Sequence, residues 1–112
     1  MGIISVVGLG LIWGRMRANA AEADLVSRLV STVYDKLKSQ AKAYDQDIPR
    51  PRYLTSLHLR DELLRNEHSV RTRARVWQRV EYAIESNTNI RVSLEETAEG
   101  EEMHAWTWIG IL

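Results

Sequence analysis

The sequence contains no cysteine, and this absence excludes several classes of site. Without thiols the chain has no disulfide framework, no cysteine nucleophile and no cysteine-ligated metal centre, and it suits a reducing compartment. Phenylalanine is also absent, so tryptophan and leucine must fill the core. The length of 112 residues is that of one domain, and 45% hydrophobic with 27% charged residues is typical of a soluble fold.

Basic residues are missing from the C-terminal part of the chain. Residues 94–112 hold no lysine or arginine, whereas residues 1–52 hold eight basic and five acidic side chains and residues 53–93 hold seven and five. The formal net charge of zero is therefore +5 cancelled by −5. Because partners respond to the local field, the sequence predicts a surface of two signs. The five acidic residues form one acidic segment: Glu95, Glu96, Glu99, Glu101 and Glu102.

Motifs for catalysis or metal binding are lacking as well. His58, His68 and His104 do not stand at metal-ligand spacing, and there is no nucleophile elbow or phosphate-binding loop. The glycines near the N-terminus lack the dinucleotide-binding spacing and the strand–helix–strand context that it needs. We therefore predict a protein that is not an enzyme and has no metal, no cofactor and no small-molecule substrate.

Residues 2–14 carry no charge and are followed by Arg15 and Arg17. As a helix they would span ~20 Å, less than the ~30 Å of a bilayer's hydrocarbon core. The sequence therefore predicts the C-terminal part of a transmembrane helix, with Trp13 at the interface and a basic flank. On this interpretation residues 1–17 contact the membrane and residues 18–112 form the folded domain.

Apolar residues at helical spacing predict a helix over 20–43, ended before a connector at 45–51 that two prolines hold extended. A second helix is expected to begin near Thr55, an N-cap, with Leu54 packing on Leu59. A third is expected over 70–86 after a Ser69 cap, with Val70 on its apolar face. The predicted core contains Val30, Val33, Leu63, Trp77, Ile84, Trp106 and Trp108.

Two stretches alternate like half-buried strands. Ile90, Val92 and Leu94 are predicted to share one face of the first strand, and residues 105–109 alternate again after the acidic segment. Three helices followed by a two-stranded antiparallel hairpin predict a mainly α fold of the α+β class, a winged helix with a two-stranded wing.

The third helix carries a basic face that is costly for helix stability. Arg71, Arg75 and Arg79 stand at i, i+4 spacing and repel one another. Arg71, Arg73 and Arg75 lie in the positive first turns, while Glu81 and Glu85 lie near the negative end. One interpretation is a solvated face neutralised by glutamates of neighbouring elements; the other is a docking face for DNA phosphates or an acidic protein. The acidic segment would repel DNA and favours a protein partner. The basic face contains Arg71, Arg75, Gln78, Arg79 and Tyr82.

Four stretches in this order resemble the C-terminal winged-helix (MSC) domain of LEM-family inner nuclear membrane proteins, with the fungal Heh-type branch most similar. They are PRYLTSLHLRDELL at 51–64, RVWQRV at 75–80, ESNTNIR at 85–91 and AWTWIG at 105–110. The resemblance covers about residues 22–110. It implies that residues 2–14 end the second of two transmembrane helices, with the domain on the nucleoplasmic side of the inner nuclear membrane.

The resemblance also implies a function without catalysis. Domains of this family recruit and activate an ESCRT-II/ESCRT-III hybrid adaptor protein for nuclear envelope sealing and pore surveillance, and some bind DNA or chromatin. The family has no short functional motif to carry over, so the expectation that the basic face binds the partner depends on its charge pattern alone.

Overall fold

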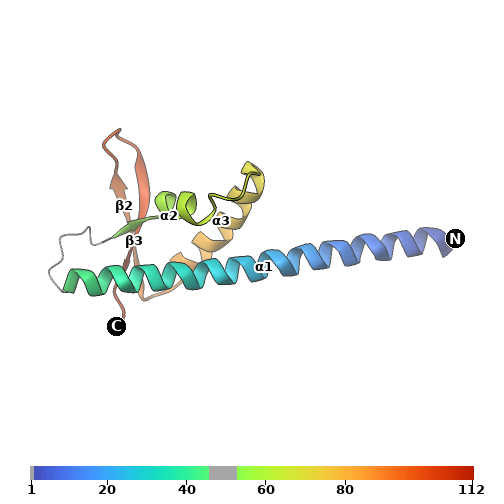
Figure 1. The fold of residues 1–112 in the computed structure, drawn as a ribbon, viewed down its shortest axis with the longest axis horizontal. Coiled ribbons are helices and arrows are strands. Elements are labelled where there is room, and N and C mark those ends of the chain that lie inside the picture. Colours follow the sequence, from blue (N-terminus) through green and yellow to red (C-terminus); the bar gives the residue numbers. More distant parts are fainter. Residues whose placement is uncertain (1, 46–52) are drawn as a thin grey trace.

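The computed structural model describes residues 2–45 and 53–112, with side chains from residue 19 onward up to residue 43 and again from residue 53. Within these ranges three helices and three strands follow one another (Figure 1). The elements are α1 (Gly2–Asp45), β1 (Leu54–Thr55), α2 (Ser56–Leu63), α3 (Val70–Glu85), β2 (Ile90–Glu96) and β3 (Glu102–Trp108).

The first helix is longer than the sequence pattern predicts. The expected helix over 20–43 lies inside α1, which continues without a break back to Gly2. No proline occurs in this stretch to remove a backbone donor, so the apolar N-terminal run joins the amphipathic helix. In the part of the chain that the structure describes, no helix combines the length and apolarity needed to span a membrane.

Two predictions concern residues outside the described part. The side chains of residues 1–17, predicted to end a transmembrane helix, are not described, and neither is most of the connector at 45–51. The transmembrane assignment and the extended connector therefore stay predictions.

The second helix begins where the capping signal places it. Thr55 is the N-cap residue with φ −85° and ψ 140°, although its side chain makes no capping hydrogen bond. Its extended backbone continues from Leu54 and forms β1, which the sequence analysis did not predict. Leu54 pairs with Trp106 and Thr55 with Ala105 of β3.

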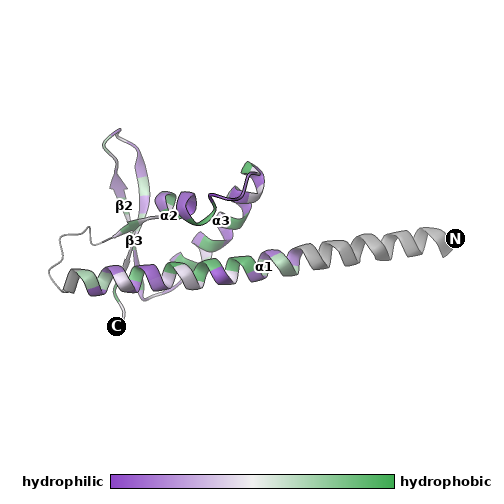
Figure 2. Cartoon of the chain, in the orientation of Figure 1, coloured by the Kyte–Doolittle hydropathy of each residue, from purple (hydrophilic) through white to green (hydrophobic). Residues whose placement is uncertain are grey.

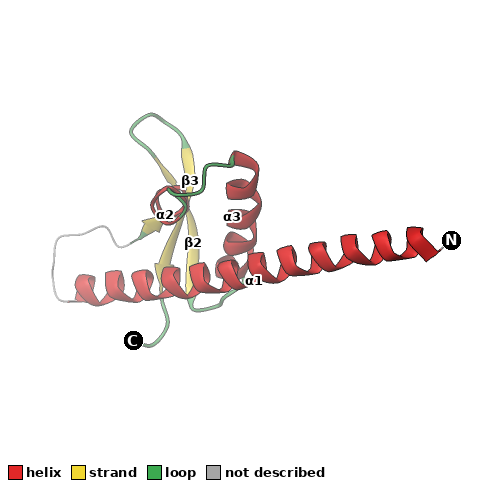
Figure 3. Cartoon of the chain, turned by 45° about the vertical axis from the view of Figure 1, so that its right-hand side comes forward, coloured by secondary structure: helices red, strands yellow, loops and turns green. Residues whose placement is uncertain are grey.

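The sheet therefore has three antiparallel strands in the order β1-β3-β2, and the prediction of two strands is wrong in this respect (Figure 3). An N-cap residue has an extended backbone, so it can continue a short strand that precedes the helix. Here that short strand, β1, pairs with the β2–β3 hairpin. The β2–β3 register runs without interruption from Ile90 opposite Trp108 to Glu96 opposite Glu102. Figure 1 shows the far end of this hairpin projecting away from the helices.

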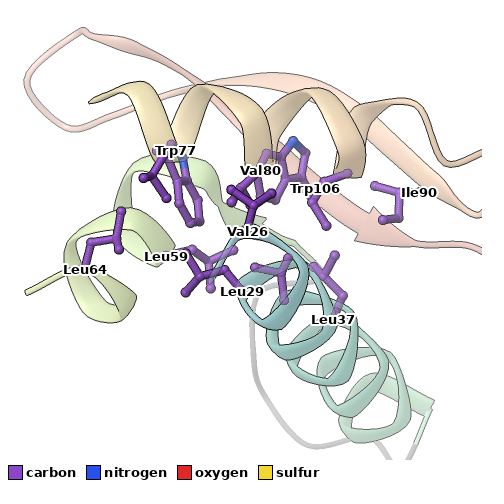
Figure 4. Close-up of a cluster of buried hydrophobic side chains, with 12 residues drawn as sticks. Val26, Leu29, Leu37, Leu59, Leu64, Trp77, Val80, Ile90 and Trp106 are labelled. Carbon is purple, nitrogen blue, oxygen red and sulfur yellow. The ribbon is translucent and has the colours of Figure 1, made fainter. Parts of the chain in front are cut away.

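The core lies between α1, α2, α3 and the inner face of the sheet (Figure 4). The rings of Trp77 and Trp106 stack at its centre, with centroids 6.1 Å apart and planes 26° apart. Among the predicted core residues, Val33, Trp77, Ile84 and Trp106 are buried. Val30, Leu63 and Trp108 are partly buried and pack against the same cluster.

Three apolar residues expected on buried faces are exposed. Val70 is 78% exposed, because the first turn of α3 extends past the core cluster. Val92 and Leu94 are 39% and 61% exposed, whereas Ile90 in the same strand is buried. The alternating pattern predicts that Ile90, Val92 and Leu94 lie on the same face of β2. Only Ile90 is buried, because the strand continues beyond the part of the sheet that the helices cover.

Candidate interaction surface

The third helix presents the predicted basic face to solvent. Ser69 caps α3 by accepting a hydrogen bond from Thr72 N at 3.3 Å, which fixes where the helix begins and which face it buries. All five side chains of the basic face are exposed. Four of them line an open hollow of 440 Å³ beside Val26 of α1: Arg75, Gln78, Arg79 and Tyr82.

Two arginines of this face share one carboxylate from α1. Arg75 Nε lies 2.6 Å from Glu22 Oε1, and Arg79 Nη1 lies 2.9 Å from Glu22 Oε2. The Glu22 side chain is only 15% exposed, whereas those of Arg75 and Arg79 are 61% and 44% exposed. Glu22 therefore offsets the repulsion between the two arginines, and the glutamate that does so comes from α1 rather than from the acidic segment.

The electrostatics of Glu22 follow from these contacts. The hydrogen bond from Arg75 is the largest influence and holds the pKa of Glu22 below its usual value of 4.5, with help from Arg79 and against partial desolvation. The carboxylate is consequently ionised at neutral pH. One negative charge beside two guanidinium groups leaves this part of the face positive.

Three further charges that oppose the α3 dipole also have structural partners. Arg73 donates from Nη2 to the carbonyl oxygen of Glu67 at 2.7 Å. At the C-terminal end, Glu81 accepts a hydrogen bond from Ser56 Oγ at 2.6 Å, and Glu85 lies 2.5 Å from His104 Nδ1. These contacts with neighbouring elements explain a charge order that an isolated helix would disfavour.

Arg71 differs from the other arginines of the helix. It is exposed, and no acidic side chain within the described ranges forms an ion pair with it. No acidic residue occurs in the first turn of α3 either. Among the described residues, Arg71 is therefore a positive charge without an ion-pair partner at the positive end of the helix.

The acidic segment extends along the far half of the hairpin. Glu95 and Glu96 belong to β2 and Glu102 belongs to β3, so only Glu99 and Glu101 lie in the connecting turn. Figure 2 shows this end of the hairpin as largely hydrophilic. Within the chain as described, none of these five glutamates forms an ion pair with a lysine, an arginine or a histidine.

Sequence reasoning missed a buried polar network beneath α2 and α3. Ser56 is 3% exposed; its hydroxyl accepts from Trp77 Nε1 at 2.8 Å and donates to Glu81. Only the three-dimensional arrangement brings these residues together, so no local pattern could reveal them.

Another ion pair joins α1 to α2. Lys36 Nζ lies 2.7 Å from Glu62 Oε1, and both residues line an open groove between the two helices.

The three histidines lie in different parts of the fold. His58 is exposed on α2 and His68 is exposed before α3, while His104 contacts Glu85. Among the side chains that the structure describes, no group of three or more histidine or acidic residues could hold a metal ion.

Comparison with known proteins decides the family. The sequence profile of the Man1-Src1p-C-terminal domain, MSC, matches residues 1–111. This chain belongs to the MSC family. The MSC domain described here is 33% identical over 86 residues to "Inner nuclear membrane protein SRC1" of Saccharomyces cerevisiae. The match includes 76% of this chain and 10% of that relative, so the chain spans about a tenth of the relative's length. No solved structure matches this chain significantly.

Proposed function

We propose that this MSC domain is a non-enzymatic interaction module of the nuclear envelope that recruits and activates the ESCRT-II/ESCRT-III hybrid adaptor. Membership of the family and the name of the yeast relative support a location at the inner nuclear membrane. In this proposal the apolar N-terminal segment contacts the membrane, and the folded domain lies on the nucleoplasmic side.

The hollow on α3 is the proposed binding site for the partner, and its composition is the main observation in favour of the proposal. It combines two arginines with Tyr82, an aromatic ring that is 78% exposed. Tyrosine and arginine are enriched at the energetic centres of protein interfaces, because each offers apolar area together with hydrogen-bonding groups. An exposed tyrosine beside partly neutralised arginines fits an acidic protein surface.

The charge distribution favours a protein over a polyanion. Glu22 lowers the positive charge of the hollow, and the acidic segment adds five carboxylates elsewhere on the same domain. A DNA duplex would be repelled by those carboxylates, whereas a protein can carry complementary patches of both signs.

The test is a titration of the 112-residue chain with the hybrid adaptor. We expect Tyr82→Ala and Arg71→Glu each to weaken binding by about tenfold, the effect of an interface residue contributing ~1.4 kcal/mol. Arg65→Glu is the matched control, because Arg65 is exposed and lies outside the basic face. Absence of binding by the folded wild-type domain at low salt would refute the proposal.

DNA or chromatin binding is the second candidate, and the unpaired Arg71 is the observation that favours it. If the fold is a winged helix, α3 takes the place of the helix that enters the major groove. DNA binding would then weaken steeply with salt and be lost in Arg71→Glu and Arg75→Glu. An affinity for duplex DNA that is flat in salt would contradict this candidate.

A further inference from the structure

The strand β2 leaves one side of the sheet without a partner. Among the residues that the structure describes, the strand order β1-β3-β2 puts β2 at an edge, where it pairs with β3 alone. Its seven residues contain no proline, no lysine and no break in register, so its charged residues, Arg91, Glu95 and Glu96, are the edge protection that it has. Val92 and Leu94 are exposed on this strand, so no helix covers them fully.

The register identifies which backbone groups are free. Ile109 N donates to Asn89 O at 2.8 Å, so the pair of Asn89 and Ile109 is a hydrogen-bonded one. Hydrogen-bonded and non-hydrogen-bonded pairs alternate along an antiparallel ladder. The N–H and C=O groups of Val92 and Leu94 therefore point away from β3, toward the open side.

We propose that β2 pairs antiparallel with β2 of a second copy of this chain, about a two-fold axis at Ser93. In this register Val92 lies opposite Leu94 of the other copy, and Arg91 lies opposite Glu95 of the other copy. The two-fold symmetry makes each of these pairs occur twice. The outward backbone groups of Val92 and Leu94 then meet each other, as the hydrogen-bond alternation requires.

The opposite charges of Arg91 and Glu95 favour a second copy of this chain as the partner, and they favour this register. Arg91 forms no ion pair in the part of the chain that the structure describes, and Glu95 contacts only Ser93 Oγ, at 3.4 Å. Shifting the axis to Val92 or to Leu94 separates Arg91 from Glu95 and puts one of the apolar residues opposite itself. The antiparallel arrangement also sends the turns of the two hairpins in opposite directions, which keeps the acidic tips apart.

Few side chains take part, so the association is weak and transient for separate molecules in solution. A symmetric interface of this kind is closed, since each copy uses its β2 edge and leaves no β2 edge for a third. The inference is independent of the proposed function, because β2 lies outside the basic face of α3.

Cross-linking tests the register directly, because the chain has no cysteine of its own. Residues on the axis form a non-hydrogen-bonded pair with Cα atoms about 4.5 Å apart, which lies within the range of a disulfide. We expect Ser93→Cys to form a disulfide-linked dimer under mild oxidation. Ser31→Cys, at an exposed site on α1, is the matched control and is expected to cross-link at least about tenfold more slowly.

A charge exchange tests the partner. In sedimentation equilibrium of the full chain, we expect Arg91→Glu and Glu95→Arg each to weaken dimerisation by about tenfold, and the double variant to restore it. Arg71→Glu and Tyr82→Ala are expected to leave dimerisation unchanged, which separates this inference from the proposed function. A chain that is monomeric at every concentration, or a Ser93→Cys variant that reacts no faster than Ser31→Cys, would overturn the proposal. Binding of a foreign extended peptide by a monomeric chain would also overturn it.

Discussion

Glu22 and Arg75 are 53 positions apart in the sequence, yet the Oε1 atom of Glu22 lies 2.6 Å from the Nε atom of Arg75. This contact fastens α1 to α3 next to the hollow proposed to bind a partner. Glu22 therefore has two roles: it stabilises the packing of two helices, and it competes with any external anion for the same guanidinium groups.

Substitution of Glu22 separates these roles. We expect Glu22→Gln to lower the free energy of unfolding by about 0.5–1 kcal/mol, a small amount because both arginines are largely solvated. The same variant should bind an acidic partner more tightly, since Arg75 and Arg79 lose their internal competitor. Denaturant titration at low and high salt measures the first effect. Asp24→Asn is the control, because it removes an exposed ion pair with Arg28, and neither of these residues lines the hollow.

Acid should destabilise the domain through two carboxylates. A hydrogen bond from Arg75 lowers the pKa of Glu22, and one from Lys36 lowers the pKa of Glu62, both from an ordinary value of 4.5. A group whose pKa is lower in the folded state stabilises the fold above its unfolded pKa and loses that effect as the pH falls through the folded pKa. We therefore expect stability to fall below pH 4.5.

A double variant checks the origin of this acid sensitivity. With Glu22→Gln and Glu62→Gln together, the unfolding free energy should depend less on pH below 4.5 than it does in the wild type. Equal pH profiles for the two proteins, measured by thermal melts across the acid range, would contradict the assignment.

The buried hydroxyl of Ser56 should be costly to remove. Ser56→Ala leaves Trp77 Nε1–H without its acceptor and Glu81 without a donor, and we expect a loss of ~1–3 kcal/mol in the free energy of unfolding. Ser86→Ala removes an exposed hydroxyl that donates to Tyr82 O and should change stability by less than about 0.5 kcal/mol. Equal effects of the two substitutions would show that the network contributes nothing.

The turn of the hairpin depends on a glycine. Gly100 has φ +83°, a left-handed conformation, and its N–H donates to Thr97 O at 2.9 Å. We expect Gly100→Ala to destabilise the hairpin by about 1 kcal/mol, and Gly100→Asn by less, because asparagine tolerates this conformation. Amide hydrogen exchange at β2 and β3 measures the difference; similar exchange rates in both variants would rule out backbone conformation as the cause.

Local signals predicted the parts of the fold that depend on local physics. The capping residues Thr55 and Ser69 mark the starts of α2 and α3, since an N-cap satisfies backbone donors in its own turn. The alternating patterns likewise predict strands that include Ile90 and Trp106. The family was confirmed from stretches of sequence spread over most of the chain.

Other features depend on which elements meet in space. The two residues of β1 are too few for a periodic pattern, and only the position of β3 makes Leu54 and Thr55 a strand. Alternation shows that Leu94 shares a face with Ile90, but it cannot show that the helices stop short of Leu94. The partner of Arg75 and Arg79 comes from an element 53 and 57 positions away, beyond the reach of any local rule.

The unbroken course of α1 has a mechanical consequence. A helix without a hinge transmits rotation, and each residue turns it by about 100° and advances it by about 1.5 Å. The continuous helix therefore fixes the rotational orientation of the folded domain about the axis of residues 2–14. One residue inserted between residues 14 and 19 would rotate α3 and the hairpin by about 100° around that axis relative to residues 2–14, and so change the direction in which they face.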